Sequence, residues 1–263
     1  MKSFTLFFSF AALTAALLFG CAPSPVGSYQ SAATYDRVLF SDTAKEAFRF
    51  QGPERNPVVV IHGFLGAKLG NAKSCEMVWG KFSARPPAAA ELKQLAHPMI
   101  PGRPLREIPT DLVPLSILDE ADVEVGVFNF TFPGYRTAID QLVKAGYVDA
   151  DKPLPKDRKY ADLFSFAYDW RRDLPETAER LHRFLLEKRE ELQKIYEREY
   201  GLKDYDVQFD IVAHSMGGLV ARYYLMYGGR DLPENPAEVP VPDWSGAKLV
   251  DKVIVAGTPN DGY

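Results

Sequence analysis

Cysteine and histidine are both scarce in this chain of 263 residues, which has two cysteines and four histidines. Two cysteines cannot build a disulfide framework or a four-thiolate zinc site, and the sequence indicates neither a metal nor an organic cofactor. The formal net charge is −4 and no dense basic run occurs, which excludes nucleic acid as a partner class. Plentiful aromatic and β-branched residues exclude an intrinsically disordered chain.

The first twenty residues have the layout of a secretory leader. Lys2 precedes an apolar run, from Phe4 to Phe19, that is too short to be typical of a membrane span. The segment Leu18-Phe19-Gly20-Cys21 resembles a bacterial lipobox, so we expect cleavage before Cys21 and lipidation of its thiol. This predicts anchoring to a membrane of the cell envelope, the outer membrane if the cell has one. An ordinary signal peptide with a chance cysteine is the alternative.

The remaining chain is predicted to form a tether, residues 21–50, and one α/β domain, residues 51–263. Alternating strand and helix patterns imply a mostly parallel sheet with helices on both faces. From about residue 67 to 133 periodicity is weak and prolines are frequent, so we expect a loop-rich cap insertion with short elements only. Strands are predicted from Val58 to the loop at Gly63, and at 163–167, 207–213 and 249–256; helices are predicted between Tyr135 and Gly146, between Asp173 and Gly201, and at 216–227.

The sharpest motif is DIVAHSMGGLVARYYL, in which a β-branched strand runs through Ala213 and His214 to Ser215 and a helical pattern follows at once. This setting fits a nucleophile elbow, where strand and helix crowd each other and require small residues such as Ala213 and Gly217. Glycine is usual at the first of these positions, so Ala213 is a mild departure. The Met216 N–H would donate to an oxyanion. The alternative is a serine in an ordinary strand-to-helix turn.

The second motif is His62-Gly63-Phe64-Leu65-Gly66, directly after the first predicted strand. A His-Gly loop at this place typically supplies the other oxyanion N–H, here from Phe64 or Leu65. His62 would then fix the loop rather than transfer protons. Alone the motif also fits a plain turn, but its pairing with the elbow favours an oxyanion loop.

The third motif is Tyr168-Asp169-Trp170-Arg171-Arg172. Physical grounds alone favour a structural interpretation, an ion pair of Asp169 with Arg171 or Arg172 beside a buried indole. Asp169 precedes the serine, so it does not occupy the place of a triad acid.

Together these motifs resemble the lecithin:cholesterol acyltransferase family of α/β-hydrolases, which includes phospholipid:diacylglycerol acyltransferases and bacterial and lysosomal phospholipases. The likeness begins near Pro57 and comprises, in family order, VVVIHGFLGAKL, MVWG, FPGYRTAIDQLVKAGY, AYDWRRD, AHSMGGLVARYYL and AGTPNDGY.

The resemblance implies an α/β-hydrolase fold, lipid ester substrates and Ser215 as the acyl-accepting nucleophile. It also implies oxyanion donors at Met216 and at Phe64 or Leu65. Trp79 falls where the family's lid carries an aromatic residue that meets lipid. The family's lid disulfide is absent, because Cys75 has no partner.

A catalytic base is missing from the position that this fold requires. The triad acid and histidine should follow the serine, but no histidine follows Ser215. His62 and His214 belong to the two loops, His97 to the cap and His182 to the long predicted helix. Because serine is a weak nucleophile without a positioned base, we expect the N-terminal part of a longer enzyme, weakly active or inactive by itself, without the last strands of its sheet.

The favoured hypothesis is a lipid-anchored serine esterase that cleaves acyl esters of phospholipids or neutral lipids through an acyl-serine intermediate, with hydrolysis favoured over transfer. One alternative is a non-catalytic lipoprotein that binds lipid or a partner through its cap. Another is a serine peptidase or other hydrolase on the same scaffold. The elbow and oxyanion loop argue against mere binding, because binding needs neither.

Overall fold

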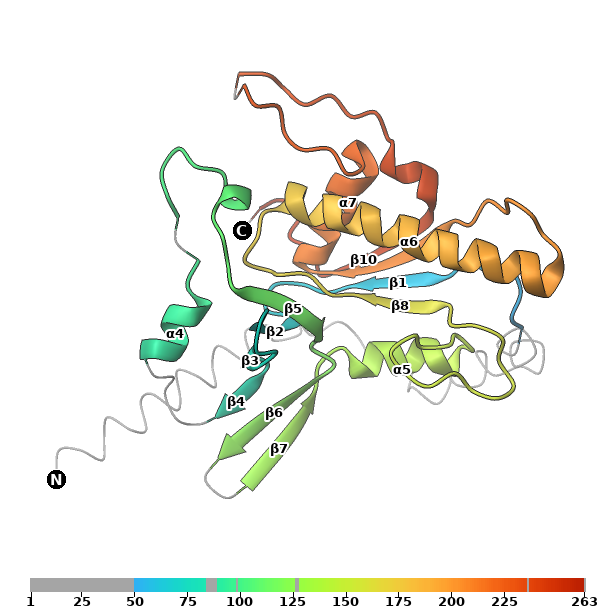
Figure 1. Ribbon diagram of the computed structural model, residues 1–263, viewed down its shortest axis with the longest axis horizontal. Coiled ribbons are helices and arrows are strands. Elements are labelled where there is room, and N and C mark those ends of the chain that lie inside the picture. Colours follow the sequence, from blue (N-terminus) through green and yellow to red (C-terminus); the bar gives the residue numbers. More distant parts are fainter. Residues whose placement is uncertain (1–49, 84–88, 98, 126–127, 236, 263) are drawn as a thin grey trace, which may run out of the picture. The chain divides into compact units, whose positions relative to one another are not determined.

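The computed structural model describes residues 50–83, 89–97, 99–125, 128–235 and 237–262 (Figure 1). The predicted leader, Cys21 and all of the predicted tether except Phe50 lie outside these residues. A four-stranded parallel sheet, ordered β10-β9-β1-β8, forms the centre of the described part. Its strands are β1 (Val58–Ile61), β8 (Leu163–Phe166), β9 (Phe209–His214) and β10 (Val250–Ala256). The predicted α/β class with a parallel sheet is therefore confirmed.

Helices cover both faces of this sheet, α6 and α7 on one and α5 on the other (Figure 1). The alternation of side chains along β1 shows why both faces are apolar. Val59 and Ile61 join the cluster formed with α6 and α7, whereas Val58 and Val60 pack with Ile139 of α5. The helices are α5 (Arg136–Lys144), α6 (Leu174–Tyr200) and α7 (Met216–Tyr227).

The long helix α6 begins and ends where its sequence predicts. The Asp173 carboxylate caps its start by accepting a hydrogen bond of 2.9 Å from the Glu176 N–H. Gly201 ends it with φ of 70°, a left-handed conformation that favours glycine. Its core-facing side chains are Leu181, Leu185, Leu192 and Tyr196, all of them buried. This prediction is confirmed.

The segment between β1 and α5 is more regular than the expected loops. Its described residues form two three-stranded sheets, ordered β3-β2-β5 and β4-β6-β7, and two short helices. Pro114 lies within β5, which is possible because β5 is an edge strand and an edge needs fewer backbone donors. The elements are β2 (Ala67–Asn71), β3 (Met77–Trp79), β4 (Lys81–Ser83), α4 (Ala89–Leu95), η1 (Leu105–Glu107), β5 (Leu112–Ile117), β6 (Glu120–Val125) and β7 (Phe128–Pro133).

The strand β10 forms one edge of the central sheet, and the 3₁₀ turn η2 (Gly246–Leu249) leads into it. Ile254 and Val255 of this strand are 62% and 46% exposed. None of the helices in the described ranges has both the length and the apolar character needed to cross a membrane.

Candidate active site

Ser215 lies in the sharp turn between β9 and α7. Its backbone has φ of 52° and ψ of −123°, a combination that costs a non-glycine residue energy and that functional turns retain. The turn is held by a hydrogen bond of 2.8 Å from the Ser215 N–H to the Ala256 carbonyl of β10. The side chain is half-buried at the carboxyl end of the parallel strands. This is the geometry that a nucleophile elbow requires.

The His62–Gly66 loop after β1 passes directly against this turn. A Cβ atom added to Gly63 would lie 2.7 Å from the Ser215 Cβ, closer than real Cβ atoms approach. A Cβ on Gly217 would lie 2.4 Å from the His62 carbonyl oxygen. Ala213, the other flanking residue, is fully buried. The small residues flanking the serine thus allow loop, strand and helix to meet at Ser215.

Three backbone N–H groups of the His62–Gly66 loop and of the turn at Ser215 have no protein acceptor in the described residues. Leu65 has φ of 63°, and the Gly66 N–H donates to the Gly63 carbonyl at 3.1 Å, which closes the loop into a tight turn. Within the described ranges, the N–H groups of Phe64, Leu65 and Met216 donate to no protein acceptor. Met216 is the first residue of α7, where N–H groups are unpaired and the helix dipole favours negative charge. These are the donors that the sequence predicts for an oxyanion.

His62 is fully buried and both of its ring nitrogens are occupied. Nδ1–H donates to the Gly63 carbonyl at 2.7 Å, and Nε2 accepts the Tyr168 N–H at 3.1 Å. The Tyr168 ring stacks on the imidazole at 4.0 Å, and its hydroxyl donates to the His62 carbonyl. Burial lowers the pKa of His62 to about 4, so the ring is neutral near pH 7. These contacts fit the predicted role of fixing the loop.

The low pKa of His62 predicts an acid-dependent loss of stability. The unfolded chain takes up a proton near the usual histidine pKa of 6.5, but the folded chain does so only near 4. The contribution of neutral His62 to the free energy of unfolding is therefore fully present above about pH 6.5. Up to about 3 kcal/mol of it is lost as the pH decreases to 4. Urea unfolding across this range should show a shallower pH dependence for His62→Gln. Equal slopes for the variant and the wild type would contradict the assignment.

Tyr135, just before α5, connects the oxyanion loop to the elbow. Its hydroxyl oxygen accepts the Gly63 N–H at 2.7 Å and lies 2.7 Å from His214 Nδ1. Because the oxygen already accepts one hydrogen bond, its own hydrogen is best assigned as donated to Nδ1. Tyr135 belongs to the segment FPGYR, but nothing in the sequence indicates a role for it. Tyr135 lies 72 positions after Gly63 and 79 positions before His214 in the sequence, so only the folded chain brings the three residues together.

None of the four histidines, all of which the structure describes, is hydrogen-bonded to the Ser215 hydroxyl. His62 serves the loop, His214 contacts Tyr135, and His182 lies 3.2 Å from the Tyr224 hydroxyl. His97 contacts Arg172. Across the described ranges, no group of three or more His, Cys, Asp or Glu side chains could hold a metal ion.

A row of aromatic rings leads away from the oxyanion loop. The Phe64 ring, 58% exposed, lies edge-on to Trp170 at 5.0 Å, and Trp170 lies 5.5 Å from Trp79. Trp79 Nε1–H donates to the Leu65 carbonyl at 3.1 Å, and its ring is 5.0 Å from Phe82. Trp79 thus contacts the loop that supplies the oxyanion donors. The sequence predicted only a buried indole at Trp170, whereas this side chain is half-buried and packs between Phe64 and Trp79.

Asp169 and Arg171 form the ion pair expected from the YDWRR motif. Two nitrogens of Arg171 donate to the Asp169 carboxylate, at 2.9 and 2.6 Å, and both side chains are at least 95% buried. The same guanidinium donates to the Leu95 carbonyl and the Thr110 hydroxyl. The neighbouring Arg172 pairs with Glu176 instead. Through these two hydrogen bonds of Arg171, the ion pair connects the chain just after β8 to the segment between β1 and α5.

The model of the family described as lecithin:cholesterol acyltransferase matches residues 128–262, just over half of the chain. The matched stretch runs from β7 to β10 and includes Ser215, whereas β1 and the oxyanion loop precede it. No curated protein matches the chain.

Proposed function

Because the chain belongs to the lecithin:cholesterol acyltransferase family, which suggests acyltransferase or lipase-type activity, we propose that it is a serine esterase of the α/β-hydrolase fold. Its substrates would be acyl esters of phospholipids or neutral lipids. Ser215 would be the nucleophile, and the N–H groups of Met216 and of Phe64 or Leu65 would stabilise the oxyanion. The single observation that carries this proposal is the strained Ser215 turn packed against Gly63.

The proposed reaction has two steps, acylation of Ser215 and release of the acyl group. The Ser215 oxygen attacks the ester carbonyl, and the carbonyl oxygen becomes an oxyanion that accepts hydrogen bonds from the available N–H groups. Loss of the alcohol leaves an acyl group on Ser215, and water then releases it as the carboxylic acid. An alcohol in place of water would give acyl transfer. The hydroxyl proton needs a base, and no described histidine contacts that hydroxyl, so nucleophile and oxyanion geometry alone support the proposal.

We also propose that the protein is held at a membrane of the cell envelope by lipid on Cys21. The support is the leader sequence, since Leu18-Phe19-Gly20-Cys21 resembles a lipobox. A Cys21→Ser variant should lose both processing before residue 21 and its place in the membrane fraction. Normal processing and retention of this variant would reject lipidation.

A non-catalytic lipoprotein is the second candidate, because no histidine or carboxylate in the described part of the chain is hydrogen-bonded to Ser215. A fluorophosphonate probe separates the two, since it reacts only with an activated serine. We expect labelling of the full chain that is slow, because no described base contacts the hydroxyl, and we expect its loss in Ser215→Ala and its retention in Ser245→Ala, which changes a serine outside the turn. Equal labelling of wild type and Ser215→Ala would reject nucleophilic activation and favour the binding protein.

A further inference from the structure

The β4–β6–β7 sheet gathers apolar side chains on one face. In register, Phe82 of β4 lies beside Val123 of β6, and Val123 lies opposite Phe130 of β7. Partners in register share a face, as do residues two apart on one strand, so Phe132 belongs to the same face. Phe130 and Phe132 are 50% and 55% exposed. We call this surface the hairpin face, defined by Phe82, Val123, Phe130 and Phe132.

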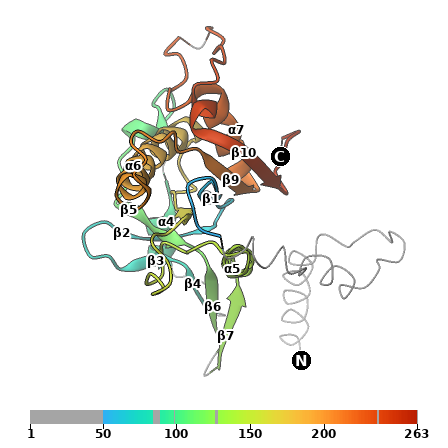
Figure 2. The same ribbon diagram turned by 90° about the vertical axis from the view of Figure 1, so that its right-hand side faces the viewer.

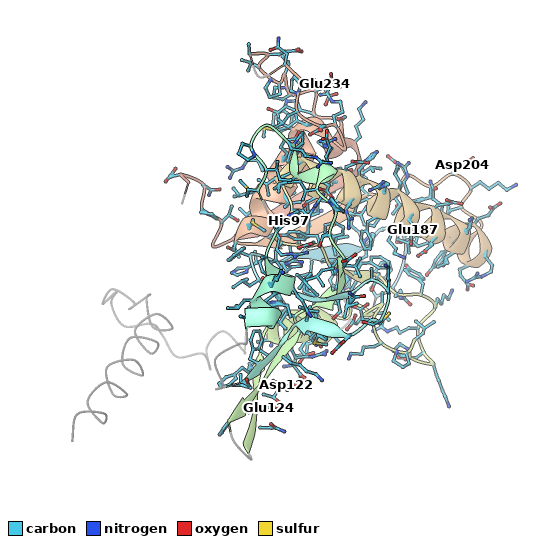
Figure 3. The ribbon with its side chains drawn as sticks, turned by 60° about the vertical axis from the view of Figure 1, so that its left-hand side comes forward. His97, Asp122, Glu124, Glu187, Asp204 and Glu234 are labelled. Atoms are coloured by element: carbon cyan, nitrogen blue, oxygen red, sulfur yellow. The ribbon has the colours of Figure 1, made fainter. Side chains whose placement is uncertain are left out.

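The opposite face of the same sheet is polar. Asp122 and Glu124 alternate with Val123 along β6, and both are exposed (Figure 3). The Thr131 hydroxyl donates to the Asp122 carboxylate at 2.8 Å. Lys81 lies in register with Asp122. The sheet is therefore amphipathic, and its charged groups are confined to the side away from the hairpin face.

The hairpin face is continuous with the candidate active site. Phe82 lies 5.0 Å from Trp79, which begins the aromatic row through Trp170 to Phe64. Phe64 directly follows Gly63, the residue packed against Ser215. An apolar path thus runs from the exposed hairpin to the oxyanion loop. The β6–β7 hairpin also extends away from the central sheet, as two perpendicular views show (Figures 1 and 2).

We propose that the hairpin face docks on an uncharged or zwitterionic phospholipid surface and that acyl chains reach Ser215 along the aromatic row. This inference deepens the proposed esterase function and rests on it. Transfer of the half-exposed phenylalanine rings from water into an acyl layer is favourable, because it removes apolar surface from water. The acidic residues on the polar face disfavour an anionic surface, because like charges repel within a Debye length. Continuity with the candidate site favours lipid over a second copy of the chain.

The test measures partition of the full chain onto phosphatidylcholine vesicles by flotation, in a Cys21→Ser background so that a lipid anchor cannot hold the protein. Phe130→Ser with Phe132→Ser should lower the partition coefficient by about ten- to a hundredfold. The matched control, Asn129→Ser with Thr131→Ala, changes the polar face of the same strand and should stay within about twofold. Phe130→Leu with Phe132→Leu should retain binding, because the face stays apolar.

Circular dichroism establishes that each variant is folded. Equal partition of the serine double variant and its background would overturn docking at this face. A dimer that becomes monomeric in that variant, with vesicle binding unchanged, would overturn it in favour of self-association. Soluble fluorophosphonate reports on Ser215 separately and should label all variants equally. If no protein is labelled, but the Cys21→Ser background still binds vesicles and the serine double variant binds them less, the esterase function is rejected and docking remains supported.

Discussion

Replacing Asp169 by asparagine is expected to lower the free energy of unfolding by about 3–5 kcal/mol. The substitution leaves the Arg171 guanidinium buried, with 5% of its side chain exposed and its carboxylate partner gone. A buried charge without a counter-charge costs far more than the pair contributes when both partners are present. Urea or thermal unfolding measures the loss. Because Trp170 lies between these residues, the aromatic row beside the oxyanion loop should loosen as well.

The control for this prediction is an exposed ion pair on α6. Glu190 and Lys194 are 2.6 Å apart, and both side chains are about 70% exposed. Water already screens such a pair, so Glu190→Gln should leave the unfolding midpoint unchanged. Similar losses in Asp169→Asn and Glu190→Gln would contradict the assignment of the Asp169 effect to burial.

Replacing Gly217 by alanine is expected to destabilise the fold by about 3 kcal/mol and to disrupt the Ser215 turn. The added Cβ would lie 2.4 Å from the His62 carbonyl oxygen and 2.7 Å from that of Ile61. Both atoms belong to the backbone at the end of β1, so no side-chain rotation relieves the contact. The higher helix propensity of alanine offsets about 1 kcal/mol at most. Fluorophosphonate labelling of Ser215 should fall together with stability.

Gly201→Ala is the matched control for this substitution. No atom lies within 4 Å of a Cβ at Gly201, and only its φ of 70° opposes the change. The expected cost is about 1 kcal/mol, and labelling of Ser215 should be retained. If Gly217→Ala is no more destabilising than Gly201→Ala, the close packing of α7 against β1 is wrong.

The central sheet and its helices could be predicted from the sequence because their signals are local. β-branched runs mark β1 and β9, and Asp173 and Gly201 mark the ends of α6. The turn at Ser215 was also predictable, since a strand pattern runs into a helix pattern with small flanking residues. In each of these cases neighbouring residues carry the information.

The contacts around the site could not be predicted, because they join residues far apart in the chain. Tyr135 bridges Gly63 and His214, and Trp170 packs between Phe64 and Trp79. Neither the residues around Tyr135 nor those around Trp170 in the sequence indicate these contacts. In the two small sheets before α5, the pairings of β2 with β5 and of β4 with β6 join distant segments, so no local signal indicates them. The β6–β7 hairpin is local and its residues alternate between apolar and polar, so this part of the sheet was predictable from the sequence.

The most direct test of the account is to find the acyl group on Ser215. The full chain is mixed with para-nitrophenyl decanoate, quenched in acid within seconds, digested and analysed by mass spectrometry. The account predicts a decanoyl group on the peptide that contains Ser215, and its absence from Ser215→Ala. Release of para-nitrophenol at equal rates from both proteins, with no decanoyl group on Ser215, would contradict it.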